Sequence, residues 1–126
     1  MLLPPSNDAL RGYSADLAVL DEAAYMQDEV EIALRPMLAA SQGRLVMLST
    51  PWGRRGFFYD AWTRGEEWER HCVPAYDVPK ITLPWLLRER KAMPDHAFRQ
   101  EFMVEFVDGH GGGLVSEEAM RNAFGY

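Results

Sequence analysis

Two short apolar runs, each followed at once by a polar motif, constrain the fold of this chain more than any other feature. The runs are Leu17–Leu20, which precedes Asp21-Glu22, and Leu45–Leu48, which precedes Ser49-Thr50-Pro51. Continuous apolar runs of this length are typical of strands that are buried on both faces of a parallel sheet. The carboxyl ends of parallel strands meet at one edge of a sheet, where ligands gather. We therefore expect any chemistry directly after Leu20 and directly after Leu48.

The remainder of the chain alternates helix-like and turn-like segments. Residues Asp28 to Ala40 favour helix, and Pro36 is expected to divide them into two short helices. Further segments are assigned as helices over Phe57–Arg64, Thr82–Met93, Pro94 to Phe106 and Val115–Phe124, and as a third strand over Glu69–Tyr76. Strands that alternate with helices predict an α/β domain with a mainly parallel sheet flanked by helices.

Composition narrows the class of protein. The chain has 126 residues, 48% of them hydrophobic and 25% charged, as expected for a globular domain, and we expect no membrane span and an intracellular location. A net charge of −6 argues against a free-standing nucleic-acid-binding arm, although a local DNA contact stays possible. The single cysteine, Cys72, is expected to be a small buried hydrophobe in the third strand, and the three histidines lack zinc-like spacing.

The pair Asp21-Glu22 has the form of the Walker B motif of ATPases. Nucleotide phosphates are bound together with Mg²⁺, a hard cation that prefers carboxylate oxygens, often through water. An acid at the end of a rigid strand meets that need, and its neighbour can polarise a water for in-line attack on the terminal phosphate. Taken alone, the pair also fits a solvated acidic turn.

Ser49-Thr50-Pro51 is a hydroxyl pair followed by a proline. At the end of a strand beside the first one, the hydroxyls can sense a terminal phosphate, and the proline stiffens the loop that carries the signal outward. Taken alone, the motif is a common turn. The pairing of the two motifs, with a helical segment between their strands, is far more specific than either motif by itself.

With these motifs in place, the chain resembles the large terminase subunits of tailed phages and prophages, which pump DNA into capsids. The resemblance runs through LRGYSADLAVLDEAAYM (Leu10–Met26), GRLVMLSTPWGRRGFFYDAW (Gly43–Trp62) and FRQEFMVEFVDG (Phe98–Gly109). It implies a partial P-loop NTPase fold of the ASCE type. Residues 1–107 would be the carboxyl-terminal part of the ATPase domain, and residues 108–126 a linker and short helix leading toward a nuclease domain.

The resemblance also implies roles for individual residues, with ATP and Mg²⁺ as cofactors. Asp21 would be the magnesium-associated acid and Glu22 the base that activates water, while Ser49, Thr50 and Pro51 would form the motif that couples hydrolysis to movement. Arg11 would be an arginine finger that reaches into a neighbouring subunit, or else a surface ion-pair residue. Arg54 and Arg55 are candidate contacts to DNA phosphates, or a solvated pair.

One departure from the family pattern matters most. A complete motor needs G-x-x-x-x-G-K-[ST], and neither lysine of this chain, Lys80 or Lys91, lies in that context. The Walker A strand, loop and helix are therefore missing from the sequence, and we expect the isolated chain to hydrolyse ATP poorly or not at all. In the intact family the partners implied are double-stranded DNA, the portal, the small terminase subunit and like subunits in a ring, in the cytoplasm of a bacterial host.

Two other readings stay open at this stage. A helicase core also pairs an Asp-Glu-Ala motif with a strand that ends in Ser or Thr, although Phe98–Gly109 favours a terminase. Alternatively, the chain is a non-catalytic prophage remnant that acts as an interaction module. Half a sheet exposes an edge and an apolar face, so such a module would be expected to self-associate.

Overall fold

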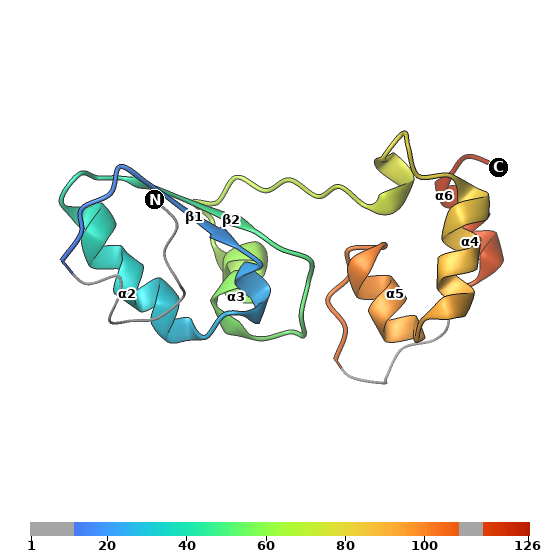
Figure 1. The fold of residues 1–126 in the computed structure, drawn as a ribbon, viewed down its shortest axis with the longest axis horizontal. Coiled ribbons are helices and arrows are strands. Elements are labelled where there is room, and N and C mark those ends of the chain that lie inside the picture. The colour runs from blue at the N-terminus through green and yellow to red at the C-terminus, as the bar shows by residue number, and fades with distance from the viewer. Residues whose placement is uncertain (1–11, 109–114) are drawn as a thin grey trace. The chain divides into compact units, whose positions relative to one another are not determined.

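The computed structural model describes residues 12–108 and 115–126. Their helices and strands, labelled in Figure 1, are β1 (Leu17–Asp21), the 3-10 turn η1 (Ala23–Tyr25), α2 (Asp28–Ala39), β2 (Arg44–Leu48), α3 (Gly56–Arg64), the 3-10 turn η2 (Ala75–Asp77), α4 (Leu83–Ala92), α5 (Asp95–Glu101) and α6 (Glu117–Ala123). The described chain forms two compact units. Unit 1 comprises the chain up to Ser49 together with Arg55–Glu66, and unit 2 comprises Thr50–Arg54 together with Glu67–Tyr126.

Unit 1 is built on a parallel pair of strands. β1 pairs with β2 in a register that sets Leu17 beside Arg44, Val19 beside Val46 and Asp21 beside Leu48. The two apolar runs thus form the two predicted strands, and the expected α/β class with a parallel sheet is confirmed.

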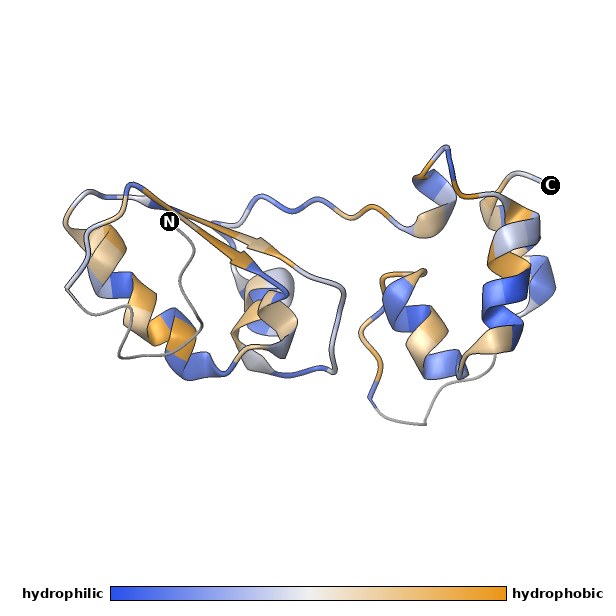
Figure 2. Cartoon of the chain, viewed as in Figure 1, coloured by the Kyte–Doolittle hydropathy of each residue, from blue (hydrophilic) through white to orange (hydrophobic). Residues whose placement is uncertain are grey.

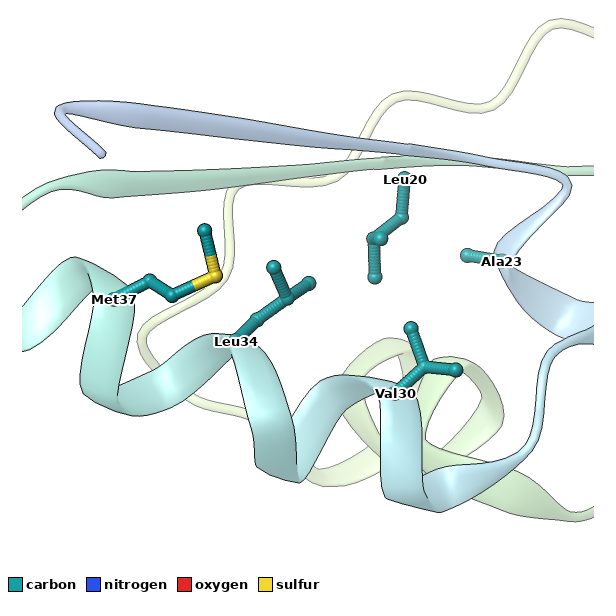
Figure 3. Packing of buried hydrophobic residues seen from close by; sticks show 5 residues of the cluster. All are labelled: Leu20, Ala23, Val30, Leu34 and Met37. Carbon is teal, nitrogen blue, oxygen red and sulfur yellow. The ribbon is translucent and has the colours of Figure 1, made fainter. Parts of the chain in front are cut away.

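The core of unit 1 lies on one face of this sheet. Leu20 points from β1 toward α2, whose buried residues Val30, Leu34 and Met37 recur at helical spacing and point back toward the strands (Figure 3). Phe57 and Phe58 at the start of α3 pack against the same cluster. Helices α2 and α3 therefore cover one face, and the strands contribute their even-numbered β1 residues and odd-numbered β2 residues to it.

The opposite face of the sheet is exposed, which contradicts the prediction of strands buried on both faces. Leu17, Val19, Val46 and Leu48 are 49%, 53%, 41% and 52% exposed. Figure 2 shows both strands in the colour of hydrophobic residues along most of their length. Hydropathy alone predicted burial on both faces, but within the described residues helices lie on only one of them.

Gly43 allows the chain to turn tightly from α2 into β2. A Cβ atom at this position would lie 2.4 Å from the carbonyl oxygen of Ala15 and 2.9 Å from Cδ2 of Leu38. The backbone approach is fixed by hydrogen bonds, because the Gly43 N–H donates to Leu38 O (2.9 Å) and the Arg44 N–H to Asp16 O (2.9 Å). Only glycine fits here without displacing the backbone.

Pro36 lies inside α2 and does not divide it, so the prediction of two helices was wrong. The missing N–H of a proline removes one helical hydrogen bond. That cost falls in the last turn of α2, on the exposed side of the helix. The burial of Leu34 and Met37 on either side holds the helix together.

Unit 2 contains helices and extended chain but no strand among its described residues. Its core gathers Leu86 of α4, Phe98 of α5 and Met120 of α6, each 0% exposed, with Ala75 and Leu83. The ring of Phe102 meets those of Phe98 and Trp85, with ring centroids 5.4 and 5.5 Å apart. α4 begins after Thr82 with Pro84 in its first turn, as predicted.

Three expectations for unit 2 were wrong. Glu69–Tyr76 is not a strand: the segment before η2 is extended, and no ladder partner exists for it among the described residues. Cys72, expected to be buried in that strand, is therefore exposed. α5 ends at Glu101, so Phe102 and Phe106 lie beyond it rather than on one continuous helix.

Among the helices of residues 12–108 and 115–126, none has the length and apolar character that a membrane span requires.

Candidate functional site

The two strand-end motifs meet at one edge of the sheet. Asp21 is paired with Leu48 at the ends of the two strands, so the chain leaves the sheet at the same edge after each strand, at Glu22 and at Ser49. Asp21 and Glu22 are exposed and Ser49 is half-buried. The parallel register thus brings the acidic pair and the first hydroxyl to the same edge of the sheet. Asp21 and Ser49 are 28 residues apart in the sequence.

Glu22 has a left-handed backbone, with φ 57° and ψ 41°. Residues other than glycine rarely adopt this conformation, which costs about 1–2 kcal/mol. Two hydrogen bonds hold it: the Glu22 N–H donates to Oδ1 of Asp21 (3.1 Å), and the Tyr25 N–H donates to Glu22 O (3.0 Å). Such outliers cluster at functional sites, and this one turns the chain sharply just past the two carboxylates.

Ser49 is tied to the same turn. Its Oγ accepts a hydrogen bond from the Ala24 N–H (3.1 Å), two residues after Glu22. The hydroxyl of the second motif therefore contacts the backbone of the first, across the ends of the two strands.

The later residues of the second motif belong to unit 2. The division between the units falls between Ser49 and Thr50, and Pro51 is one of the most fully buried side chains of the chain. The two predicted DNA contacts are consecutive residues, of which Arg54 belongs to unit 2 and Arg55 to unit 1. Arg54 forms an ion pair with Asp108, in which Nε of the arginine lies 3.7 Å from Oδ2 of the carboxylate. Both arginines are exposed.

Arg11 lies outside the described residues, so its predicted role as an arginine finger stays a prediction.

His71 lies on an exposed stretch, where its Nε2 is 2.9 Å from Oε1 of Glu69. Within the described parts of the chain no three His, Cys, Asp or Glu side chains gather as a metal cage. Mg²⁺ needs no such cage, because it is commonly held by one or two carboxylates together with water and phosphate oxygens. The exposed Asp21 carboxylate, with one oxygen on the Glu22 N–H, fits that chemistry.

Sequence reasoning missed two residues that hold the second motif. Gln100 of α5 is 5% exposed and donates from Nε2 to Pro51 O (2.9 Å). Asp108 accepts from the Arg54 N–H at Oδ1 (3.0 Å). A polar residue between Phe98 and Phe102 was a weak signal of a buried amide, whereas nothing in the sequence pointed from Asp108 to residue 54.

Comparisons with known proteins agree with one another. Residues 2–119 match the family model described as terminase large subunit, T4likevirus-type, N-terminal. The terminase large subunits of Thermus phage G20c and Thermus virus P23-45 are each 31% identical over 127 residues, covering 86% of this chain and 26% of those proteins. The chain thus spans about a quarter of the length of these relatives.

Solved structures point the same way. The large terminase ATPase domain of Thermus phage P74-26 matches with a TM-score of 0.65 and 32% identity, over 79% of this chain and 47% of that one. An arginine-to-alanine variant of the same domain matches with a TM-score of 0.66 and 31% identity, over 80% and 48%. The fold, the acidic pair and the sequence comparisons are consistent, and this chain belongs to the terminase large subunit family.

Proposed function

We propose that this chain is the carboxyl-terminal part of a terminase ATPase domain and contributes the hydrolytic half of an ATP-driven DNA-packaging motor. One observation carries the proposal: Asp21-Glu22 and Ser49 adjoin at the carboxyl ends of paired parallel strands, with Glu22 in a strained left-handed turn. Nucleotide chemistry in open α/β sheets occurs at this edge. The partial coverage of the solved ATPase domains and the uncovered apolar face of the sheet support the view that more of the domain packs here.

The proposed chemistry assigns each residue a role. Asp21 would hold Mg²⁺ through water, and Mg²⁺ would neutralise charge on the nucleotide phosphates. Glu22 would orient and polarise the attacking water. Ser49, Thr50 and Pro51 would report the presence of the terminal phosphate, and Arg11 would stabilise charge in the site of a neighbouring subunit.

The proposal extends to partners only through the family. The whole protein would act on double-stranded DNA together with the portal, the small terminase subunit and like subunits in a ring, in the cytoplasm of a bacterial host. Arg55, exposed at the start of α3, is then the better of the two candidate DNA contacts, because Arg54 is engaged by Asp108.

A chimera tests the catalytic assignment. This chain would replace the matching part of the ATPase domain of Thermus phage P74-26, so that the remainder of that domain supplies the phosphate loop. We expect ATP turnover that falls about 10²–10⁴-fold in Glu22→Gln, since the substitution removes a general base. Glu29→Gln, at an exposed acid in the first turn of α2, is the matched control and should leave turnover unchanged.

Two outcomes would contradict the proposal. Full turnover by the Glu22→Gln chimera would remove Glu22 from the chemistry. Rapid hydrolysis by the isolated 126-residue chain, abolished by Glu22→Gln, would show that the missing G-x-x-x-x-G-K-[ST] loop is not needed.

The exposed sheet face also favours a second candidate, a non-catalytic module that self-associates. Leu17, Val19, Val46 and Leu48 form a contiguous apolar surface over the paired strands. Sedimentation of the purified chain at increasing concentration should show association that Val19→Asp weakens. A monomer at high concentration would exclude this reading.

A further inference from the structure

Adjacent residues of the second motif are held by different units. Ser49 is tied to unit 1, because its Oγ accepts from the Ala24 N–H (3.1 Å). The loop that follows, Thr50–Arg54, belongs to unit 2. The peptide bond between Ser49 and Thr50 therefore joins the end of β2 to a loop in which Pro51 and Arg54 contact residues of unit 2.

The first anchor of this loop is a buried amide. Gln100 is the one polar residue in the buried core of the described chain, at 5% exposure, and its Nε2 donates to Pro51 O (2.9 Å). Because a buried amide without a partner is unfavourable, this bond favours the observed positions of Gln100 and Pro51. The burial of Pro51 itself, under 2% exposed, completes the anchor.

The second anchor lies at the other end of the loop. The Arg54 N–H donates to Oδ1 of Asp108 (3.0 Å), and the Arg54 Nε donates to Phe106 O (3.4 Å). Backbone and side chain of one arginine thus bind the same short stretch of chain. Hydrogen bonds therefore hold the loop near its start, from Gln100, and at its end, to Phe106 and Asp108.

The segment Arg99–Glu105, which precedes the residues that bind Arg54, has internal contacts of its own. Arg99 and Glu105 form an ion pair at 2.6 Å, and the Glu105 N–H donates to Arg99 O (3.0 Å). Between them Val104 has φ 57°, a strained conformation that a β-branched side chain rarely adopts. Such strain persists only where the surrounding contacts over-determine the backbone, as they do here.

We propose that Gln100 and Asp108 are positioning residues that hold Thr50–Arg54 in unit 2, so that a shift of Ser49 at the nucleotide edge is passed along the chain to this loop through the Ser49–Thr50 peptide bond. The inference rests on the proposed function and deepens it by naming the residues that transmit the change. Both residues would act through the loop that they hold.

The first experiment measures the lock in the 126-residue chain without nucleotide. Asp108→Ala removes both contacts to Arg54 and should speed hydrogen exchange of the Arg54 amide at least about 10-fold, the loss expected for one hydrogen bond of about 1.4 kcal/mol. Asp108→Asn keeps an oxygen acceptor and should restore most of the protection. Asp60→Ala, at an exposed acid of α3 paired with Arg64, is the control and should leave Arg54 unchanged. Equal exchange in all variants would overturn the lock.

The second experiment measures transmission in the chimera described above. Addition of Mg²⁺ and ATP should change amide exchange in α4 of unit 2. Asp108→Ala should at least halve that response while KM for ATP changes less than about twofold, and Asp108→Asn should retain the response. Gln100→Met, which keeps the shape but loses the donor, should act in the same direction as Asp108→Ala.

The outcomes separate this inference from the proposed function. A chimera that binds nucleotide and keeps its full α4 response in Asp108→Ala overturns the transmission but leaves the catalytic assignment intact. A loss of response matched by an equal rise in KM would show only a binding defect and would also overturn it. A chimera in which Glu22→Gln has no effect removes the proposed function, and the transmission with it, even if Arg54 is protected as expected.

Discussion

The two units of this chain solve the problem of burial in different ways. Unit 2 fully buries three large apolar side chains, Phe98, Leu86 and Met120, each at 0% exposure. Unit 1 packs α2 and α3 on one face of a two-stranded sheet and leaves four apolar strand residues about half exposed. A set of helices can close around a core by itself, whereas a parallel sheet needs cover on both faces. The unit that carries the candidate chemistry is thus the one that invites further packing.

The largest expected effect comes from the core of unit 2. Phe98→Ala should cost about 3–5 kcal/mol, because a fully buried ring leaves a cavity. If each unit holds its own core, amide exchange in α4 and α5 will rise sharply while β1 and β2 stay protected. Leu34→Ala, in the core of unit 1, should give the reverse pattern at about 2–5 kcal/mol. If either variant lost amide protection in both units together, the two units would not have independent cores.

A close backbone approach should make unit 1 sensitive to a single methyl group. Gly43→Ala would place Cβ 2.4 Å from Ala15 O, so the strands must shift, at about 1–3 kcal/mol. Thermal unfolding followed by amide exchange in β1 and β2 measures this. Ala40→Ser, at an exposed position just before the turn, serves as the control. A Gly43→Ala chain as stable as the parent would contradict the close contact between residue 43 and the Ala15 carbonyl oxygen.

One aspartate in each unit joins two elements by accepting a backbone hydrogen bond, which allows a matched test. Asp28 accepts from the Phe57 N–H (3.0 Å) in unit 1, and Asp95 accepts from the Val115 N–H (2.9 Å) in unit 2. Each Asp→Ala change should cost about 1–2 kcal/mol in its own unit, and each Asp→Asn change less, since the amide keeps an acceptor oxygen. Urea unfolding monitored by exchange in each unit checks this. Effects that cross from one unit to the other would mean that the two are one cooperative body.

A smaller effect is expected at the start of α6. Ser116 caps this helix by accepting the Ala119 N–H at Oγ (3.0 Å). Ser116→Ala should cost about 1 kcal/mol and fray α6, with β1 and β2 unchanged. Ser116→Asp should retain the cap. Equal protection of α6 in the parent and in Ser116→Ala would show that the cap contributes nothing.

The smallest effect concerns pH. A hydrogen bond from Arg121 lowers the pKa of Glu117, with added attraction from the same guanidinium (2.8 Å). Because the folded-state pKa is depressed, the stabilisation is present above the unfolded pKa and is lost as pH falls through the folded one. Glu117→Gln should therefore slightly flatten the acid side of the stability profile of unit 2. The exposed pair makes this change small. An unchanged profile would show that the pair contributes nothing.

Much of the fold followed from local pattern. The two strands, the helix between them, α4 with its first-turn proline and the terminal α6 were all predicted, because apolar periodicity and capping residues act over a few neighbours. The errors came where distant contacts decide. Pro36 stays inside α2 because the residues around it are buried, and Glu69–Tyr76 stays outside a sheet because it finds no ladder partner in the described structure.

The same division applies to the candidate site. Asp21, Glu22 and Ser49 were predicted as neighbours because parallel strands align their ends, and that requires only a knowledge of strand positions. The left-handed turn at Glu22 was not predicted, since it depends on the hydrogen bonds of η1. Gln100 and Asp108 were missed because they approach the Thr50–Arg54 loop from about fifty residues away in the sequence.

By itself, then, the sequence determined the two paired strands and the polar motifs that follow them, because hydropathy and motif spacing are properties of the chain alone. Only the tertiary structure decided which face of the sheet is covered, that Ser49 and Thr50 belong to different units, and that two distant polar side chains hold the loop between Pro51 and Arg54. The physical reason is that burial and hydrogen-bond partners are chosen in space, where separation along the chain has no influence on which atoms meet.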